Sequence, residues 1–269
     1  MENFSGISMV KDPKALITQR DRWGDYFALT IASASIALNA QPGQFIMVRT
    51  GEEPYPLLRR PFSIFSAAKP ILTIFFQKVG LGTTQLSRKK KNDTLDIIGP
   101  LGKGFSIPGE GSNRRLALVG GGRGIAPLFF LAEKLISRGN NVRIYYGGES
   151  ASDLPLKARL ETAGFPLCFA TEDGSAGYKG TITEAFESEL DSTGFSFIYA
   201  CGPEAMLKKI ARASKDRNIP AELSLESVMG CGFGACWGCV KKTKNADGAH
   251  WRKVCEEGPV FAAEEVVWE

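Results

Sequence analysis

The sequence lacks the features that mark several common classes of protein. It has one histidine among 269 residues, and His250 lies between two cysteines, so we expect no Ser-His-Asp or Cys-His nucleophile. No apolar stretch approaches the ~20 residues of a transmembrane helix, and the N-terminus lacks the charged-then-apolar pattern of a secretory signal. Neither sign of charge is in large excess, because the chain has 33 basic and 29 acidic residues and a net charge of only +4. We therefore expect a cytoplasmic protein whose partners are neither nucleic acid nor membrane.

Basic residues gather at one place, the run Arg88–Lys91, which comes just before Asn92-Asp93. A solvated helix end or turn explains this run more simply than a binding patch does. For His250, a solvated loop position is likewise favoured over a ligand or proton-relay role. Four of the six cysteines crowd between Cys231 and Cys255. In a reducing cytoplasm such crowding indicates metal ligands before disulfides.

The chain is 43% hydrophobic and long enough for two ordinary domains, which excludes a disordered or fibrous protein. Its first part contains short apolar or alternating runs separated by Gly and Pro. This spacing predicts an N-terminal antiparallel β-barrel over residues 1–110, with a boundary where turn residues cluster at 107–113. The runs are Phe27–Ile36, Phe45–Val48, Ile71–Lys78 and Leu95–Ile98.

From residue 111 the pattern changes, because apolar strands without a polar face alternate with segments of helical length. Such alternation predicts an α/β domain with a parallel sheet over residues 111–221. The expected strands and helices are 116–119, 128–137, 142–146, 167–170, 182–190, 195–200 and 204–215, followed by a strand at 222–225. The remaining unit, 222–269, is too small for a hydrophobic core of its own, so a metal centre is expected to organise it.

The cysteines of this last unit have the spacing C-x4-C-x2-C, with the fourth after fifteen more residues: Cys231, Cys236, Cys239 and Cys255. That is the plant-type [2Fe–2S] pattern, whereas structural zinc usually takes paired C-x2-C or C/H knuckles. The surrounding glycines, at 230, 232, 234 and 238, allow amide N–H groups to point at the sulfurs of an anionic cluster. A [2Fe–2S] cluster is the favoured reading, and zinc is the alternative.

Two segments of the barrel region carry side chains suited to a flavin nucleotide. Arg60, fixed beside Pro61, can clamp a pyrophosphate, and the Ser63 hydroxyl can bond a flavin ring. Gly82 and Thr83 can supply backbone and hydroxyl donors to phosphate. Taken alone, this region also fits a barrel strand with a turn arginine.

A glycine turn follows the expected strand 116–119 and precedes the expected helix. Its glycines, Gly121, Gly122 and Gly124, would let a phosphate reach the unpaired N–H groups of the helix. Tyr199-Ala-Cys-Gly-Pro ends a later strand at the same edge of the inferred sheet, where ligands of such sheets bind. A choice between NADH and NADPH would depend on charges facing the ribose, and the sequence does not place the candidates Glu149, Glu172 and Asp173.

The order P-G-Q-F (42–45), R-P-F-S (60–63), G-T (82–83) and G-P-L-G (99–102) resembles the ferredoxin–NADP⁺ reductase-like flavoprotein superfamily. The resemblance implies FAD bound on the barrel by Arg60, Pro61, Phe62 and Ser63, with Phe75, Phe76 and Gln77 along the flavin edge and Gly82 with Thr83 at the phosphate. Gln77 departs from the arginine that relatives often place there, and the neighbouring Lys78 is a possible substitute. The superfamily also implies that Cys201, Gly202 and Pro203 lie where nicotinamide meets flavin, although Cys201 fits a small buried hydrophobe equally well.

Over nearly its full length the chain resembles the electron-transfer subunits of NAD-dependent (type B) dihydroorotate dehydrogenase, most closely at 224–239 and 254–268. That family implies an FMN-containing catalytic partner that oxidises dihydroorotate, electrons passing through [2Fe–2S] and FAD to NAD⁺, and a heterotetramer of two plus two subunits. No residue of this chain is then expected to be catalytic toward the organic substrate. Related subunits of cytosolic hydrogenases, sulfide-linked reductases and ferredoxin:NADP oxidoreductases remain alternatives. A zinc-stapled flavoprotein that only docks a partner is an alternative of another class.

Overall fold

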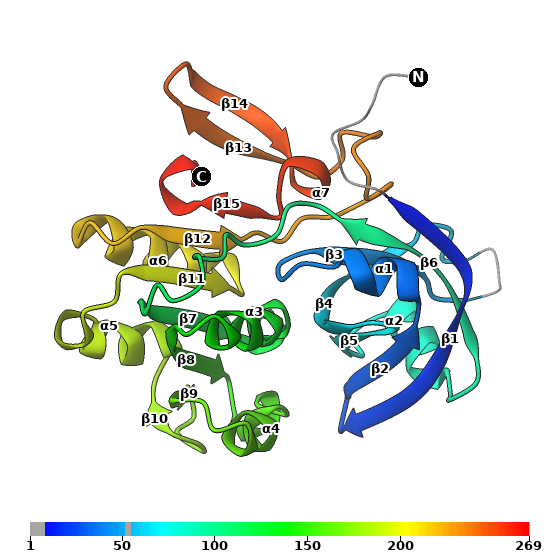
Figure 1. Ribbon diagram of the computed structural model, residues 1–269, viewed down its shortest axis with the longest axis horizontal. Coiled ribbons are helices and arrows are strands. Elements are labelled where there is room, and N and C mark those ends of the chain that lie inside the picture. Colours follow the sequence, from blue (N-terminus) through cyan, green and yellow to red (C-terminus); the bar gives the residue numbers. More distant parts are fainter. Residues whose placement is uncertain (1–8, 52–54, 269) are drawn as a thin grey trace.

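The first part of the chain forms a closed antiparallel barrel of six strands. The computed structural model describes residues 9–51 and 55–268, and the barrel occupies its right-hand side in Figure 1. The strands are β1 (Val10–Trp23), β2 (Tyr26–Ala32), β3 (Phe45–Arg49), β4 (Arg60–Ala68), β5 (Ile71–Gln77) and β6 (Thr94–Leu101), in the order β1-β2-β5-β4-β3-β6, with α1 (Ala34–Asn39) and α2 (Leu81–Arg88) between them.

Two barrel strands differ from the sequence expectation. β1 was not expected, because its polar side chains give it a mostly exposed outer face and only Ala15 and Ile17 are buried. β4 is also absent from the expected runs; it begins with the Arg60–Ser63 motif, in which Pro61 stands second and pairs with Met47. A proline near the beginning of a strand leaves most of the ladder intact. The run 27–36 also ends early, at Ala32, because Ser33 begins α1 and donates its hydroxyl to Asp12.

The second part is the predicted parallel sheet, which is confirmed. Its order is β10-β9-β8-β7-β11-β12-β15, and all neighbours are parallel except the last pair. The strands are β7 (Arg115–Gly121), β8 (Asn141–Gly148), β9 (Leu167–Thr171), β10 (Tyr178–Lys179), β11 (Phe197–Cys201), β12 (Ala221–Ser224) and β15 (Val260–Ala262). The helices are η1 (Gly122–Gly124), α3 (Ile125–Ser137), η2 (Ala151–Asp153), α4 (Lys157–Thr162), α5 (Ile182–Thr193) and α6 (Glu204–Asp216).

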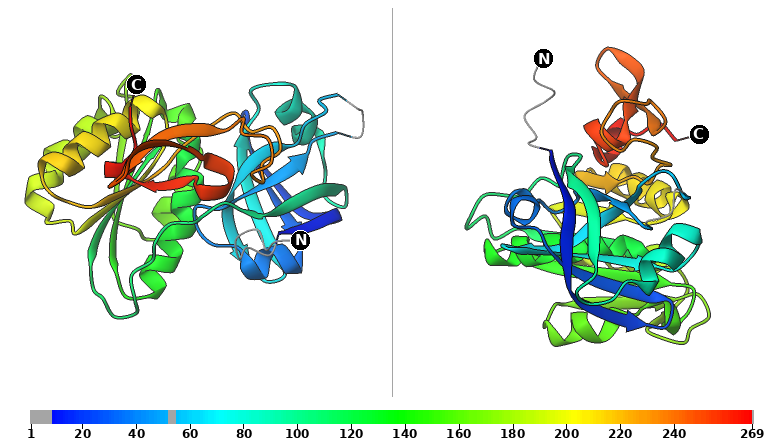
Figure 2. Two further views of the ribbon diagram at one scale, coloured as in Figure 1. Left: turned by 90° about the horizontal axis from the view of Figure 1, so that it is seen from above. Right: turned by 90° about the vertical axis from the view of Figure 1, so that its right-hand side faces the viewer.

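The C-terminal segment lies across the junction of barrel and sheet (Figures 1 and 2). It consists of the hairpin β13 (Val240–Asn245) and β14 (Gly248–Lys253), then α7 (Val254–Glu257), β15 and η3 (Ala263–Glu265). Because β12 and β15 extend the sheet, the 221/222 boundary predicted from the sequence falls inside a strand. Cys239, Val254 and Cys255 share one buried cluster with Phe45 and Met47 of the barrel. The buried residues of the C-terminal segment therefore pack into a hydrophobic core that they share with the barrel and the sheet.

Three smaller expectations can be compared with the structure. The basic run begins where α2 ends, at Arg88, as expected of a helix end. His250 is not in a loop: it lies on β14, where Nδ1 contacts the Gly248 carbonyl and Nε2 contacts Arg252. Among residues 9–51 and 55–268 we find no helix with the length and apolar character needed to span a membrane.

Candidate functional site

All nine residues predicted to hold flavin line one cavity of about 500 Å³. We call it the barrel cavity. Its predicted members are Arg60, Pro61, Phe62, Ser63, Phe75, Phe76, Gln77, Gly82 and Thr83. They come from β4, β5 and the first turn of α2, which the barrel order places next to one another. A partly aromatic cavity with one cationic end suits a flavin dinucleotide.

The cationic end forms where Arg60 meets the beginning of α2. A Cβ on Gly82 would lie 3.3 Å from Arg60 Cγ and 3.5 Å from its Nε, so the arginine packs closely against this turn. Arg60 Nη1 donates to the carbonyls of Leu58 and Arg59, at 2.8 and 3.4 Å, which leaves the N–H groups of Nε and Nη2 for a ligand. Its neighbour Arg59 is instead held by Asp96 at 2.5 Å. Arg60, beside the N-terminus of α2, is therefore the arginine of this pair whose donors are free to meet an anion.

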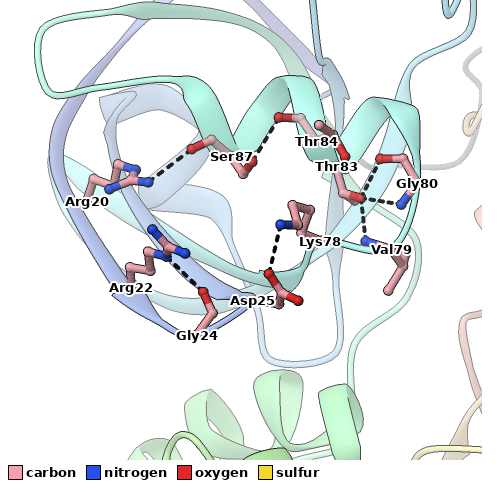
Figure 3. Close-up of polar contacts among 10 residues, drawn as sticks. All are labelled: Arg20, Arg22, Gly24, Asp25, Lys78, Val79, Gly80, Thr83, Thr84 and Ser87. Atoms are coloured by element: carbon pink, nitrogen blue, oxygen red, sulfur yellow. Dashed lines mark hydrogen bonds and ion pairs between the residues drawn. The ribbon is translucent and has the colours of Figure 1, made fainter.

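The hydroxyl of Thr83 is held by hydrogen bonds within the first turn of α2. The Thr83 hydroxyl accepts the N–H groups of Val79 and Gly80, at 2.9 and 3.0 Å, and donates to the Gly80 carbonyl (Figure 3). It is thus committed to the turn, and the backbone N–H groups of the turn are the donors that remain. Lys78 does not replace an arginine at position 77, because its ammonium lies 2.8 Å from Asp25 and lines neither cavity (Figure 3).

The predicted glycine turn and the Cys-Gly-Pro turn are in direct contact. A Cβ on Gly124 would come 2.0 Å from the Cys201 carbonyl oxygen, and one on Gly121 would come 2.8 Å from Pro203. The two turns meet because β7 and β11 are neighbours in register, with Gly120 beside Cys201. They form the floor of a second cavity of about 600 Å³, the glycine crevice, lined by Gly121, Gly122, Gly124 and Pro203.

The barrel cavity and the glycine crevice share a wall. Gln77, Arg123, Gly124 and Glu226 line both of them, and Cys201 faces the barrel cavity beside this wall. A ligand stretched along the crevice can therefore present one end to a ligand in the barrel cavity. Burial raises the pKa of the Cys201 thiol to about 12, so this side chain stays neutral. Gly202, the remaining residue of the turn, packs on Gly121 and lines a third cavity under the C-terminal hairpin.

The four predicted cluster cysteines come together as two pairs. The Cys231 N–H points at the sulfur of Cys236 at 3.5 Å, and the Cys255 N–H points at the sulfur of Cys239 at 3.4 Å. The two thiols of each pair are within hydrogen-bonding reach of each other, and Cys231 also acts electrostatically on Cys255 of the other pair. Within the described part of the chain, no three or more His, Cys, Asp or Glu side chains are arranged to hold a single ion. Two pairs of thiols fit two irons better than one tetrahedral zinc.

Backbone N–H groups surround these sulfurs, as the glycines predict. The Gly234 N–H donates to Cys255 at 3.2 Å, and Gly232 and Gly234 both have positive φ angles, +84° and +91°. The N–H groups of Cys231 and Gly238 hold the pKa of the Cys236 thiol down to about 7, whereas burial raises that of Cys255 to about 12. Such N–H donors stabilise thiolate ligands, so the donor set fits an anionic iron–sulfur cluster.

The cysteine loop lies directly against the barrel cavity. Ser227 and Met229, the residues just before the first cysteine pair, line that cavity. A Cβ on Gly232 would come 2.5 Å from the Met47 side chain, which is fully buried in β3. The barrel cavity therefore extends from the cationic end at Arg60, past the wall shared with the crevice, to the residues that precede the cysteines.

Several lining residues were not predicted from the sequence. Tyr55, Val79 and Leu81 are large, exposed and apolar or aromatic, and they line the barrel cavity near its cationic end. Arg123 and Glu226 carry opposite charges at the shared wall. Arg123 could have been noticed as the one charged residue within a glycine turn, but Glu226 gave no local signal, because its role depends on how β12 joins the sheet.

Comparison with known proteins agrees with this layout. A family model described as the iron-sulfur cluster binding domain of dihydroorotate dehydrogenase B matches residues 226–267, and one described as an oxidoreductase NAD-binding domain matches 118–212. The dihydroorotate dehydrogenase B (NAD(+)) electron transfer subunit of Desulforamulus reducens is 38% identical over 265 residues, 98% of this chain and 100% of the relative. Its counterpart from Geobacillus sp. (strain WCH70) is 40% identical over 228 residues, 84% of this chain and 86% of the relative.

One solved structure is similar over almost the whole chain. It belongs to an NADH-dependent reduced ferredoxin-NADP oxidoreductase studied for flavin-based electron bifurcation. Its TM-score is 0.83 at 30% identity, and the match covers 96% of this chain and 91% of that one. The likeness therefore extends to all three parts of the molecule, including the cysteine segment.

Proposed function

The chain belongs to the family of dihydroorotate dehydrogenase B (NAD(+)) electron transfer subunits, and we propose that it links an FMN-containing catalytic subunit that oxidises dihydroorotate to NAD⁺. When bound, FAD supplies the conversion between single electrons at a [2Fe–2S] cluster and a hydride at nicotinamide. The observation that carries the proposal is the shared wall: one cavity runs from Arg60 to Met229, beside the cysteine loop, and opens onto the glycine crevice.

Within this proposal, the barrel cavity binds FAD. Arg60 and the N–H groups of the first turn of α2 hold the pyrophosphate, because a cation and a helix N-terminus converge there. Ser63, Phe75 and Gln77 lie along the isoalloxazine. Burying the ring among Phe62, Phe75 and Phe76 also keeps water from it.

The glycine crevice binds the nicotinamide nucleotide, with its diphosphate over Gly121, Gly122 and Gly124 at the beginning of α3. Gly202 and Pro203 shape the floor that directs the nicotinamide to the shared wall. The neutral Cys201 thiol adds no charge there. Cys231 with Cys236 would hold one iron and Cys239 with Cys255 the other.

The catalytic subunit is proposed to dock over the cysteine loop. Val228, Phe233 and Trp237 are 87%, 43% and 58% exposed there, and Cys236 is exposed among them. Large apolar side chains gathered around an exposed redox ligand are typical of a protein interface. The two-plus-two heterotetramer and the cytoplasmic location belong to the same proposal.

A second candidate follows from the similar ferredoxin-NADP oxidoreductase structure. In that case the chain would exchange electrons with a ferredoxin instead of a dihydroorotate-oxidising subunit. The residues lining both cavities are compatible with either partner, because the partner touches the cysteine loop and not the nucleotide crevice.

The test is reconstitution of the full chain, loaded with FAD and cluster, with the FMN subunit from the same host. We expect dihydroorotate-dependent NADH formation that requires both proteins. Val228→Asp should weaken the complex, while Tyr178→Asp should not, since Tyr178 is exposed on β10 at the opposite edge of the sheet. NADH formation driven by reduced ferredoxin, with none from dihydroorotate, would favour the second candidate and refute the first.

A further inference from the structure

Two carboxylates stand side by side at one edge of the glycine crevice. Glu149 follows β8 and Glu172 follows β9, at the carboxyl ends of these parallel strands. The strands are in register at Gly148 and Thr171, so the two glutamates occupy the next row. Their backbones stay paired beyond the strands, because the Glu172 N–H donates to Gly148 at 3.3 Å and the Asp173 N–H donates to Glu149 at 3.1 Å.

Both carboxylates are available to a ligand. Across residues 9–51 and 55–268, neither Glu149 nor Glu172 has a side-chain hydrogen bond or ion pair. Asp153, which also lines the crevice, is already engaged: it accepts from the Tyr26 hydroxyl at 3.1 Å and from the Ser150 N–H and hydroxyl. The other carboxylate that lines the crevice, Glu226, lies at the shared wall, so Glu149 and Glu172 are the unpaired carboxylates of the β8–β9 edge.

Among the described residues, no ion pair neutralises this edge. The cations that line the crevice are Arg123, at the glycine turn, and Lys209, on α6. Arg123 acts electrostatically on the Tyr26 hydroxyl and Lys209 on Glu184 in the first turn of α5, and neither forms an ion pair with Glu149 or Glu172. A ligand group at the β8–β9 edge therefore meets two carboxylates that are not paired with a cation. Such a group must donate hydrogen bonds and carry no negative charge of its own.

Resting on the proposed nucleotide site, we infer that Glu149 and Glu172 bind the ribose hydroxyls of the adenosine half of NAD and exclude the 2′-phosphate of NADP. Neighbouring strands lie about 4.8 Å apart, so this edge is about one to two strand spacings from the glycine turn. This distance is similar to the distance between the diphosphate and the adenosine ribose of a dinucleotide. The ribose diol offers two O–H donors to acceptor-only carboxylates, whereas a 2′-phosphate is dianionic near neutral pH.

The experiment measures binding without hydride transfer. Titration calorimetry of the full chain with ADP-ribose and with 2′-phospho-ADP-ribose uses ligands that lack nicotinamide but carry the distinguishing group. We expect ADP-ribose to bind at least about tenfold more tightly, the size of one lost charge-assisted hydrogen bond plus repulsion. The Glu149→Gln, Glu172→Gln double variant should bring the two dissociation constants together. Glu172→Arg should favour the phosphorylated ligand.

Asp173→Asn is the matched control. Asp173 adjoins Glu172 but binds Ser175 at 2.6 and 2.9 Å and does not line the crevice, so the preference should stay as in the parent chain. Equal binding of both ligands by the parent chain, or an unchanged preference in the double variant, overturns the inference and leaves the nucleotide crevice standing. If neither ligand binds, both the inference and the proposed nucleotide crevice are overturned.

Discussion

Gly124 lies so close to Cys201 that a single added Cβ would come 2.0 Å from the Cys201 carbonyl oxygen. The contact joins two turns that are far apart in the sequence, and it fixes the floor on which the proposed nicotinamide site rests. Most of the site can be understood as such close approaches, at Gly82 with Arg60, at Gly121 with Pro203 and at Gly232 with Met47.

The first prediction concerns this contact. Gly124→Ala should lower the free energy of unfolding by about 1–3 kcal/mol, because the obstructing atoms are backbone and must move. Chemical denaturation followed by circular dichroism measures it. Gly109→Ala is the control, since nothing lies within 4 Å of its Cβ position. Equal stability of Gly124→Ala and the parent chain would show that the two turns are not packed as described.

The second prediction concerns flavin affinity. Arg60→Ala should weaken FAD binding by about 1.5–3 kcal/mol, because a charge-assisted contact to phosphate is lost. Flavin fluorescence released on dilution reports the change. Lys78→Ala should retain FAD, since Lys78 is paired with Asp25 and lines neither cavity. If Lys78→Ala releases flavin and Arg60→Ala does not, the phosphate end has been assigned to the wrong side chain.

The third prediction separates the two resident cofactors. Cys236→Ser should abolish the cluster while FAD remains bound, because the cysteine loop and the phosphate end of the barrel cavity come from different segments. Iron analysis and visible absorption beyond the flavin bands measure the loss. The control variant Cys168→Ser, with its substitution on β9 and outside the cysteine loop, should retain the iron of the cluster. Loss of both cofactors from a Cys236→Ser protein with an intact barrel would contradict this independence.

The fourth prediction concerns alkaline pH. Burial, reinforced by Asp153, raises the pKa of Tyr26 to about 12 from its ordinary value of 10.0. Between these values the unfolded chain loses the phenol proton and the folded chain keeps it, so the free energy of unfolding falls as pH rises. Below pH 10 this contribution is fully present. Tyr26→Phe should therefore flatten the decline between about pH 10 and 12, and an unchanged slope in denaturant titrations would count against the Tyr26–Asp153 contact.

The sequence predicted the parts of the fold that depend on local patterns. The apolar runs of β7, β8 and β11 have no polar face, so a covered parallel sheet was the natural reading. The short motifs were also readable, because cluster cysteines and phosphate-binding glycines need particular spacings. Structural comparison confirms the three-part fold. The roles of the individual flavin and nucleotide residues stay predictions, although most of these residues line the two adjoining cavities.

What the sequence could not predict depends on pairing between distant segments. β15 has three residues, and nothing in Val260–Ala262 indicates that it will join the sheet beside β12. β1 lacks an apolar stripe, because much of its length faces solvent. Glu226 acquires a place at the shared wall only through the position of β12. The acidic pair Glu149 and Glu172 could be named beforehand but not placed, since their adjacency follows from the β8–β9 register.

The central claim is that bound FAD connects the cluster to NAD⁺ within one chain. The most direct measurement is a single turnover: the cluster-loaded full chain is reduced, freed of reductant, and mixed anaerobically with NAD⁺ while the cluster bands and NADH are followed together. The reduced chain carries two electrons on FAD and one on the cluster, so we predict that FAD passes its electron pair to NAD⁺ and then takes the cluster electron. Cluster reoxidation should therefore follow NADH formation, and both should stop in Arg60→Ala protein stripped of FAD. Cluster bands that stay reduced after NADH has formed, or that reoxidise equally without FAD, would contradict the account.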